Sequence, residues 1–437
     1  MKKILIITYD WMPRNSIAVH RPYAWAKYWK EIGVDVTVLT SKKCSYDEPL
    51  DLKLNEIKGV QVIEVAYRNE KKIITGSSFI AGFKKALISF LKKNSGLFQK
   101  FLSKNYDIRD SWADSAIPIA INLHDMEKFD IIISTFGPRS CHFIAKEIKI
   151  KYPSVVWLAD YRDMWSIRHN LDLSLRQKEN EKKIELSTVN LADYVTTVSH
   201  PLAIELSAFL QKKVSVVYNG YDSEFDDFKS KIVNIHQMPK YKKTQINIVY
   251  TGIIYPGFQD PTPLFVAINN LIEQKKIRLG DVCVNFYGHR QFILKRIIDA
   301  NKAASYAVIH GHVERKISLE LQSKADLLLL LESGRSDAKG VVTGKIFEYM
   351  ISGSPVLSLG STKDSAIGEL IKETGVGVVC GENVKEIESA LLSSLEGKIE
   401  LIYKPNLDAI STYSRKVQSL NFINCLLDKI EKDGVIV

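Results

Sequence analysis

Short runs of β-branched and other apolar residues alternate with helical patterns along almost the whole chain, and this alternation restricts the possible folds most. Runs such as Asp130–Ile133 are apolar without a break, which is typical of strands buried on both faces of a parallel sheet. Strands that alternate with helices in this way predict an α/β protein with doubly wound sheets. Seven strands are expected before residue 222, at Lys3–Tyr9, Val34–Thr40, Val60–Ala66, Phe129–Ser134, Val155–Asp160, Tyr194–Ser199 and Val214–Tyr218. Six more are expected afterwards, at Ile246–Tyr250, Val282–Tyr287, Ala307–His310, Leu327–Leu331, Pro355–Leu359 and Val376–Val379.

Two such sets of strands predict two Rossmann-like domains that face a central cleft. We place the first domain at 1–222, a polar linker at 223–244, the second domain at 245–405 and a C-terminal helical segment at 406–437. A helix over Ser411–Lys432 could pack back across either domain. Ligands of open α/β sheets bind beyond the carboxyl ends of the strands, so the cleft is the expected site.

Composition narrows the class of protein. The chain has 437 residues, of which 46% are hydrophobic and 25% charged, as in ordinary globular proteins. The longest aliphatic run, Leu327–Leu331, is far too short to span a membrane. The five cysteines are scattered and form no C-x-x-C pair, so neither a disulfide framework nor a zinc site is expected. We expect a cytoplasmic protein whose opening MKKILIITYDW is a buried strand rather than an export signal.

The formal net charge is +10, and most of the excess lies in residues 1–222. A basic first half suggests an anionic partner, which could be a membrane surface, a phosphate-bearing substrate or nucleic acid. The chain contains no recognisable nucleic-acid reader motif, so we expect no nucleic-acid partner. No G-x-G-x-x-G follows the first strand, which disfavours a dinucleotide oxidoreductase.

The segment GVVTGKIFEYMISG, residues 340–353, is the most informative motif. Thr343, Gly344 and Lys345 stand at a predicted helix start, where free N–H groups and a lysine suit a diphosphate. Glu348 lies one turn further on, and its carboxylate could accept two hydrogen bonds from a ribose diol. The spacing is not that of a P-loop. An amphipathic helix with a surface lysine and glutamate is the alternative interpretation.

A second motif, WLADYRDMW, places Asp160, Arg162 and Asp163 at the end of a buried strand, between two tryptophans. Functional side chains project from this edge of an open α/β sheet. A salt-bridged strand end without catalytic function would give the same pattern.

The chain resembles glycosyltransferases of family 4, which have the two-domain GT-B fold, and in particular a bacterial subgroup used in surface-polysaccharide assembly. Four segments carry the resemblance and together extend over nearly the whole chain. They are KILIITYDWMPRN with the HRPYAWAKYWKEIGVDVTVLT that follows, STFGPRSCHFIAKEI with WLADYRDMW, LADYVTTVS with VYNGYD, and GKIFEYMISGSPVL.

The resemblance implies a nucleotide-sugar donor and assigns roles to matching residues. Gly344 and Lys345 would contact the donor diphosphate and Glu348 the ribose. Gly252 would let the backbone approach a phosphate, and Val313 would lie near the base. The strand-end residues Asp160, Arg162 and Asp163 would face the cleft from the acceptor domain.

Two departures from the family pattern affect the site. The family often has a glutamate eight positions before the one matching Glu348, and Gly340 stands there instead. The stretch after Gly252 also lacks the arginine and lysine of many members, so Lys345, Arg14 or Arg21 would supply the positive charge. Because protein cations can neutralise a departing diphosphate, and no D-x-D triplet occurs, we expect neither a metal nor another cofactor. His310 and His312 could in principle ligate a metal but are expected to be part of the strand end.

Residues Phe79–Lys104 contain six lysines and no acidic residue. At helical spacing, phenylalanines including Phe83, Phe90 and Phe101 share one side. The opposite side carries Lys85, Lys92, Lys93 and Lys100, among others. A basic amphipathic helix of this kind suits an anionic membrane surface. A helical hairpin that caps the first domain is the alternative.

The resemblance implies a glycosyltransferase that retains the anomeric configuration, and we expect it to be metal-independent and to act at the cytoplasmic face of a bacterial membrane. Its acceptor would be a lipid-linked saccharide for capsule, O-antigen or exopolysaccharide. The alternatives are a sugar-nucleotide 2-epimerase of the same fold and a degenerate nucleotide-binding protein.

Overall fold

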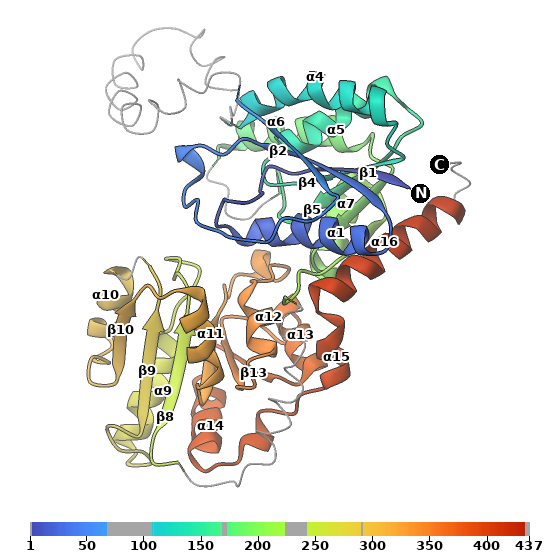
Figure 1. Ribbon diagram of the computed structural model, residues 1–437. Coiled ribbons are helices and arrows are strands. Elements are labelled where there is room, and N and C mark those ends of the chain that lie inside the picture. Colours follow the sequence, from blue (N-terminus) through green and yellow to red (C-terminus); the bar gives the residue numbers. More distant parts are fainter. Residues whose placement is uncertain are drawn as a thin grey trace, which may run out of the picture. The chain divides into compact units, whose positions relative to one another are not determined.

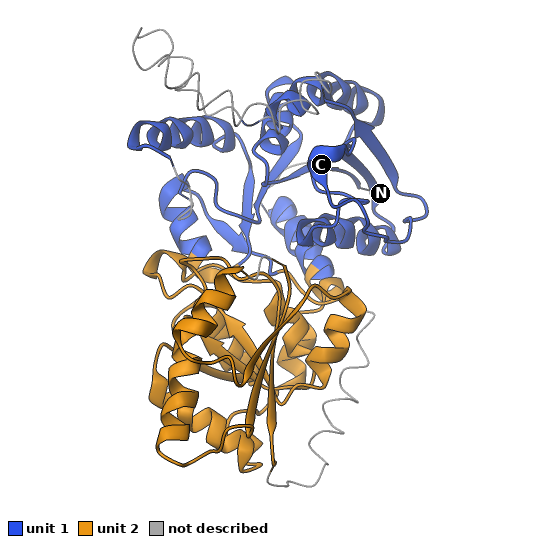
Figure 2. Cartoon of the chain, turned by 90° about the vertical axis from the view of Figure 1, so that its left-hand side faces the viewer, with its two compact units in different colours: residues 1–198, 202–218, 419–437 blue, residues 199–201, 219–418 orange. Residues whose placement is uncertain are grey.

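The computed structural model describes residues 2–67, 107, 109–167, 173–222, 243–289 and 292–432. The chain forms two compact units, coloured separately in Figure 2. Unit 1 comprises Met1–Val198, Leu202–Tyr218 and Ser419–Val437, and unit 2 comprises Ser199–Pro201 and Asn219–Gln418. Each contains a parallel sheet with helices, which confirms the predicted α/β class. Residues 223–242 of the predicted linker lie outside the described residues.

Unit 1 is built on seven parallel strands in the order β3-β2-β1-β4-β5-β6-β7. They are β1 (Lys3–Ile7), β2 (Asp35–Ser41), β3 (Gln61–Val65), β4 (Ile131–Thr135), β5 (Val156–Tyr161), β6 (Tyr194–Thr197) and β7 (Val214–Val216). All seven overlap the predicted strands. The order of the strands reverses between β1 and β4, and the crevice at such a switch point is where open α/β sheets bind ligands.

Helices cover both faces of this sheet (Figure 1). Successive side chains of a strand point to opposite faces, so Leu5 and Ile7 enter one core while Ile4 and Ile6 enter the other. The first core is closed by α4 (Asp110–Glu127), α5 (Ser140–Lys151), α6 (Leu175–Val189) and α7 (His200–Leu210), and the second by α1 (His20–Glu31) and α16 (Arg415–Lys432). Two-sided burial explains the uninterrupted apolar runs in the strands.

The C-terminal helix α16 packs back on unit 1. A short helix, α15 (Leu407–Thr412), precedes it, so α16 begins four residues after the predicted helix start. The ring centroid of Phe422 lies 5.2 Å from that of Trp25 and 5.5 Å from that of Trp29. The Trp29 indole N–H donates to the Ser419 carbonyl at 2.7 Å. These contacts fix the last helix against α1.

Unit 2 is built on six parallel strands in the order β10-β9-β8-β11-β12-β13, which reverses between β8 and β11. The strands are β8 (Ile246–Thr251), β9 (Val282–Tyr287), β10 (Ala307–Gly311), β11 (Leu327–Leu331), β12 (Val356–Leu359) and β13 (Gly377–Gly381). The helices are α9 (Thr262–Glu273), α10 (Phe292–Ala300), α11 (Arg315–Ser323), α12 (Lys345–Met350), α13 (Ala366–Thr374) and α14 (Val384–Leu395). α9, α10 and α14 share one core with the sheet, whereas α11 contacts β8 and α12 contacts β11.

Among the described residues, no helix has the length and hydrophobicity that crossing a bilayer requires.

The packing of α16 generates a test of unit 1. Phe422→Ala removes a ring that is 5% exposed and should lower the free energy of unfolding of unit 1 by about 3–5 kcal/mol. All six tryptophans belong to unit 1, so tryptophan fluorescence during urea unfolding follows this unit alone. Phe292→Ala, at a position that is 73% exposed, is the control and should leave the urea midpoint unchanged. Equal midpoints for wild type and Phe422→Ala would contradict the role given to α16.

Candidate active site

Gly252 lies at the switch point of unit 2, directly after β8. Its N–H donates to the Tyr287 carbonyl at 2.7 Å, and its φ of +141° is open mainly to glycine. A Cβ at this position would lie 2.2 Å from Cε of Lys345. Glycine here therefore leaves the space that the Lys345 side chain occupies.

Lys345 opens α12, and its ammonium lies 5.4 Å from the ring centroid of Tyr250. None of the described residues accepts a hydrogen bond from it. Burial lowers the pKa of Lys345, while the charges of Glu332 and Glu348 act in the opposite direction. A half-enclosed ammonium without an acceptor is a group that can bind an anion directly.

Glu348, the predicted ribose ligand, is held by two side chains of α11. Arg315 donates to its Oε1 at 3.3 Å and Gln322 to its Oε2 at 3.4 Å. Arg315 also donates to Asp222 at 3.0 Å, and the pKa of Arg315 is raised by these two carboxylates despite its burial. The long contacts fix the orientation of Glu348 and leave acceptor capacity on both oxygens.

The remaining predicted donor residues lie in the same unit. Thr343 and Gly344 form the turn that leads into α12, and Val313 is half-buried two residues beyond β10. His310 contacts Asn285 at 2.7 Å, and the ring of His312 stacks on that of His289 at 4.0 Å. No group of three metal-ligating side chains occurs in the described part of the chain.

In unit 1, Asp160 is fully buried, and its carboxylate accepts four hydrogen bonds. Arg21 donates to both of its oxygens, at 3.1 and 2.6 Å. The hydroxyls of Thr135 and Thr196 each donate to one oxygen at 2.8 Å. The other donors of Arg21 reach the carbonyls of Val217 and Tyr218. Asp160 and Arg21, both predicted site residues, thus join α1 to β5, and Asp160 also joins β5 to β4 and β6.

Asp10, which sequence reasoning missed, follows β1 at the switch point of unit 1 and joins two of the predicted residues. Its carboxylate lies 2.9 Å from Arg14 and 3.3 Å from Arg162. Arg162 also donates to the Gly137 carbonyl at 3.2 Å, where a Cβ on Gly137 would collide with the guanidinium. Asp163 is more exposed, at 53% of its side chain, and lies 3.7 Å from Arg162.

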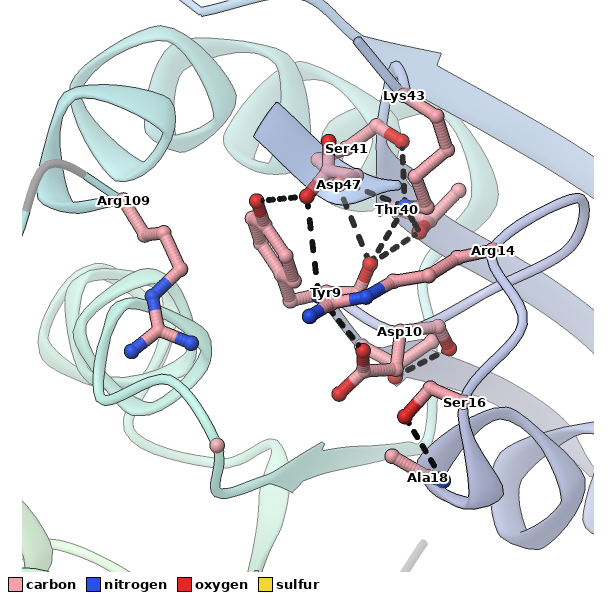
Figure 3. A network of polar contacts seen from close by, with 12 residues as sticks. Tyr9, Asp10, Arg14, Ser16, Ala18, Thr40, Ser41, Lys43, Asp47 and Arg109 are labelled. Atoms are coloured by element: carbon pink, nitrogen blue, oxygen red, sulfur yellow. Dashed lines mark hydrogen bonds and ion pairs between the residues drawn. The ribbon is translucent and has the colours of Figure 1, made fainter. Parts of the chain in front are cut away.

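Three cations surround the ring of Tyr9, which lies beside Asp10 (Figure 3). Arg14 extends between Asp10 and Asp47, and Asp47 accepts a hydrogen bond from the Tyr9 hydroxyl. Lys43 donates to backbone and side-chain oxygens of Ser41, and burial lowers its pKa to about 8. Arg109 is paired with Asp107. This polar cluster lies at the carboxyl ends of β1 and β2.

The predicted membrane-contacting residues lie outside the described residues. They are Phe83, Lys85, Phe90, Lys92, Lys93, Lys100 and Phe101.

No protein-family model and no curated protein matches this sequence. Solved structures do match. Sucrose-phosphate synthase from Thermosynechococcus elongatus is 10% identical, with 99% of this chain and 100% of that chain covered and a TM-score of 0.60. The apo form of the lipopolysaccharide outer core galactosyltransferase WaaB is 14% identical, with 98% and 100% covered and a TM-score of 0.61. The chain has the GT-B fold of glycosyltransferases.

A third similar structure is described as trehalose-6-phosphate from E. coli bound with UDP-2-fluoro glucose. It is 12% identical, with 97% of this chain and 99% of that chain covered and a TM-score of 0.59. At such identities the likeness shows the fold, which confirms the GT-B architecture that the resemblance implied.

Glu332, at the end of β11, generates a prediction about stability. Burial raises its pKa to about 7, although Lys345 lowers it. Between pH 4.5 and 7 the folded protein then holds a proton that the unfolded chain has lost, so the free energy of unfolding falls as pH rises. Glu332→Gln has no carboxyl group to titrate at this position. Its free energy of unfolding, compared with that of wild type, should therefore rise by roughly 1–3 kcal/mol between pH 4.5 and 7.

Hydrogen exchange of peptides from β8 and β11, at pH 5 and pH 7.5, would follow unit 2 by itself once rates are corrected for intrinsic exchange. Asp364→Asn is the control, because Lys339 lowers the pKa of Asp364 to about 2 and that carboxyl does not titrate in this range. Equal pH dependence for wild type and Glu332→Gln would contradict the raised pKa.

Proposed function

We propose that this protein is a retaining glycosyltransferase that moves a sugar from a nucleotide-diphosphate sugar to a lipid-linked saccharide in bacterial cell-surface polysaccharide synthesis. Similar structures support transferase chemistry and include one with a bound uridine nucleotide sugar. The observation that carries the proposal is the Lys345 ammonium, which has no acceptor among the described residues and lies beside Gly252 at the switch point.

Breaking the bond between sugar and diphosphate leaves negative charge on the departing phosphate. An ammonium held beside that phosphate lowers the energy of the transition state because the charge it stabilises grows as the bond breaks. Lys345 would supply this charge, with the N–H groups near Gly344 as further donors, and Glu348 would hold the ribose hydroxyls. A protein cation in this role makes a metal unnecessary, so we expect transfer without added divalent ions.

On the acceptor side, the proposal rests on Arg14, Arg162 and Asp163. The two arginines lie at the carboxyl edge of unit 1 and are partly exposed, at 25% and 17% of their side chains. Arg14 pairs with Asp10 and Asp47, and Arg162 pairs with Asp10 and Asp163, so both guanidinium groups are held at this edge, in position to bind an acceptor phosphate.

The first test is thermal unfolding with UDP, GDP, dTDP, ADP or CMP in excess. Binding at 100 times the dissociation constant stabilises a protein by about 2.7 kcal/mol, so one nucleotide should raise Tm. Lys345→Ala should weaken that nucleotide's affinity by about ten- to a hundredfold and slow transfer, because a charged hydrogen-bond donor is lost. Lys363→Ala, at a lysine whose side chain is 77% exposed, is the matched control.

Unchanged affinity in Lys345→Ala would remove that residue from the site. Turnover of the nucleotide sugar without an acceptor would favour the epimerase alternative.

Membrane contact is a separate, sequence-based proposal for residues 79–104. Replacing Lys85, Lys92, Lys93 and Lys100 with glutamine should reduce sedimentation with vesicles that contain phosphatidylglycerol, because each basic residue contributes about 1 kcal/mol near an anionic surface. Replacing Lys275, Lys276, Lys302 and Lys316 of unit 2 gives a control with the same change in charge. Equal sedimentation of both variants and wild type would reject the proposal.

A further inference from the structure

Glycines directly follow three strands at the carboxyl edge of the sheet in unit 2. Gly252, Gly288 and Gly360 each stand where a strand ends. A Cβ on Gly288 would lie 1.9 Å from the Gly252 carbonyl oxygen, and one on Gly360 would lie 2.0 Å from the Glu332 carbonyl oxygen. Neighbouring strand ends thus approach too closely for any other residue. Glu332 follows β11 in this row and brings a carboxyl group to the switch point, across from Gly252 on β8.

The Glu332 carboxyl group has no hydrogen-bond or ion-pair partner among the residues that the structure describes. Its Oε1 is buried, and neither oxygen has a hydrogen bond or ion pair with the described residues. A buried carboxyl without donors destabilises the folded state, and polar groups in proteins are rarely left in this condition without a reason. Lys345 is close enough to lower the pKa of Glu332, but the two side chains form no ion pair in the described structure. The missing donors can come from a ligand.

Glu332 also lines a cavity of about 590 Å³ within unit 2. The other walls come from the loop after β8, from α10, and from the ends of β12 and β13. Glu382 and Arg335 give the cavity polar groups, and Phe258 and Ile293 give it apolar ones. The guanidinium of Arg335 lies 5.8 Å from the Phe258 ring centroid. A volume of this size accommodates a small molecule, and this lining suits one with both hydroxyl groups and apolar C–H faces.

We propose that Glu332 accepts hydrogen bonds from hydroxyl groups of a sugar in this cavity, and that this sugar is the glycosyl group of the nucleotide-sugar donor. The inference rests on the proposed function. An ionised carboxyl accepts hydrogen bonds and donates none, so hydroxyls are suitable partners. An amine ligand would be repelled by Lys345 close by. A diphosphate bound at Lys345 would bring the attached sugar next to Glu332.

The test compares binding of each nucleoside diphosphate with binding of its sugar derivative by isothermal titration calorimetry. Suitable pairs are UDP with UDP-glucose or UDP-galactose, GDP with GDP-mannose, dTDP with dTDP-glucose, and ADP with ADP-glucose. In Glu332→Gln we expect affinity for the nucleotide sugar to fall at least about tenfold, because a hydrogen bond to a charged acceptor is lost. Affinity for the diphosphate alone should stay within about threefold of wild type.

Asp364→Asn removes an exposed carboxylate of the same unit and should alter neither affinity. The Tm of ligand-free Glu332→Gln at pH 7.5 should equal or exceed that of wild type, which shows that the variant folds. If the Glu332 carboxyl were needed only for structure, Glu332→Gln would instead have a lower Tm than wild type.

Three outcomes would overturn the inference. If Glu332→Gln binds nucleotide sugars as wild type does, the sugar does not contact Glu332, and the proposed function still stands on Lys345. If it loses affinity for diphosphate and nucleotide sugar equally, Glu332 acts only through Lys345. If wild type binds no member of the panel, the proposed function fails and the inference fails with it.

Discussion

Burial of both faces of each parallel sheet is the constraint on which the rest of this structure depends. Because helices cover both faces in unit 1, residues such as Ile4 and Leu5 must both be apolar, and strand interiors have little room for chemistry. Polar side chains are left to the strand ends, and ligands of open sheets bind there, at the point where strand order reverses. In unit 1 this position holds Asp10, and in unit 2 it holds Gly252 and Glu332.

Asp160 lies near the end of β5 and Glu332 directly after β11, so both carboxyl groups lie at the carboxyl edge of their sheet, but their hydrogen bonding differs. Asp160 has four donors and a paired guanidinium, so its burial is compensated and it fixes strands to one another. Glu332 accepts no hydrogen bond from the described residues, and its buried oxygen therefore destabilises the folded state. Polar groups without a protein partner tend to be retained where a ligand supplies the hydrogen bonds. The hydrogen bonding of a carboxyl group therefore distinguishes a structural role from a ligand-binding role more clearly than its place in the sheet does.

Sequence patterns were sufficient to predict the strands of both sheets but predicted the candidate site only in part. All thirteen strands were predicted, because continuous apolar runs such as Leu327–Leu331 have one simple explanation in parallel sheets. No residue range was predicted for helix α4, which includes Pro118. Arg21 was a candidate phosphate ligand, but its pairing with Asp160 joins residues 139 positions apart, and no local pattern encodes such a contact. Asp10 and Glu332 directly follow predicted strands, so the strand-end rule applied to every strand would have found both.

The arrangement of charges around Lys345 favours binding over self-pairing. An ion pair between Lys345 and Glu332 would satisfy both groups, but a ligand would then have to break it, and its affinity would fall by the free energy of the pair. In the described structure the two groups influence each other's charge without pairing, so the ammonium and the carboxyl both remain available. A nucleotide sugar is a ligand whose parts match this separation, with an anionic diphosphate for one group and neutral hydroxyls for the other. Keeping the pair apart costs stability before binding, and it means that little needs to rearrange when the ligand arrives.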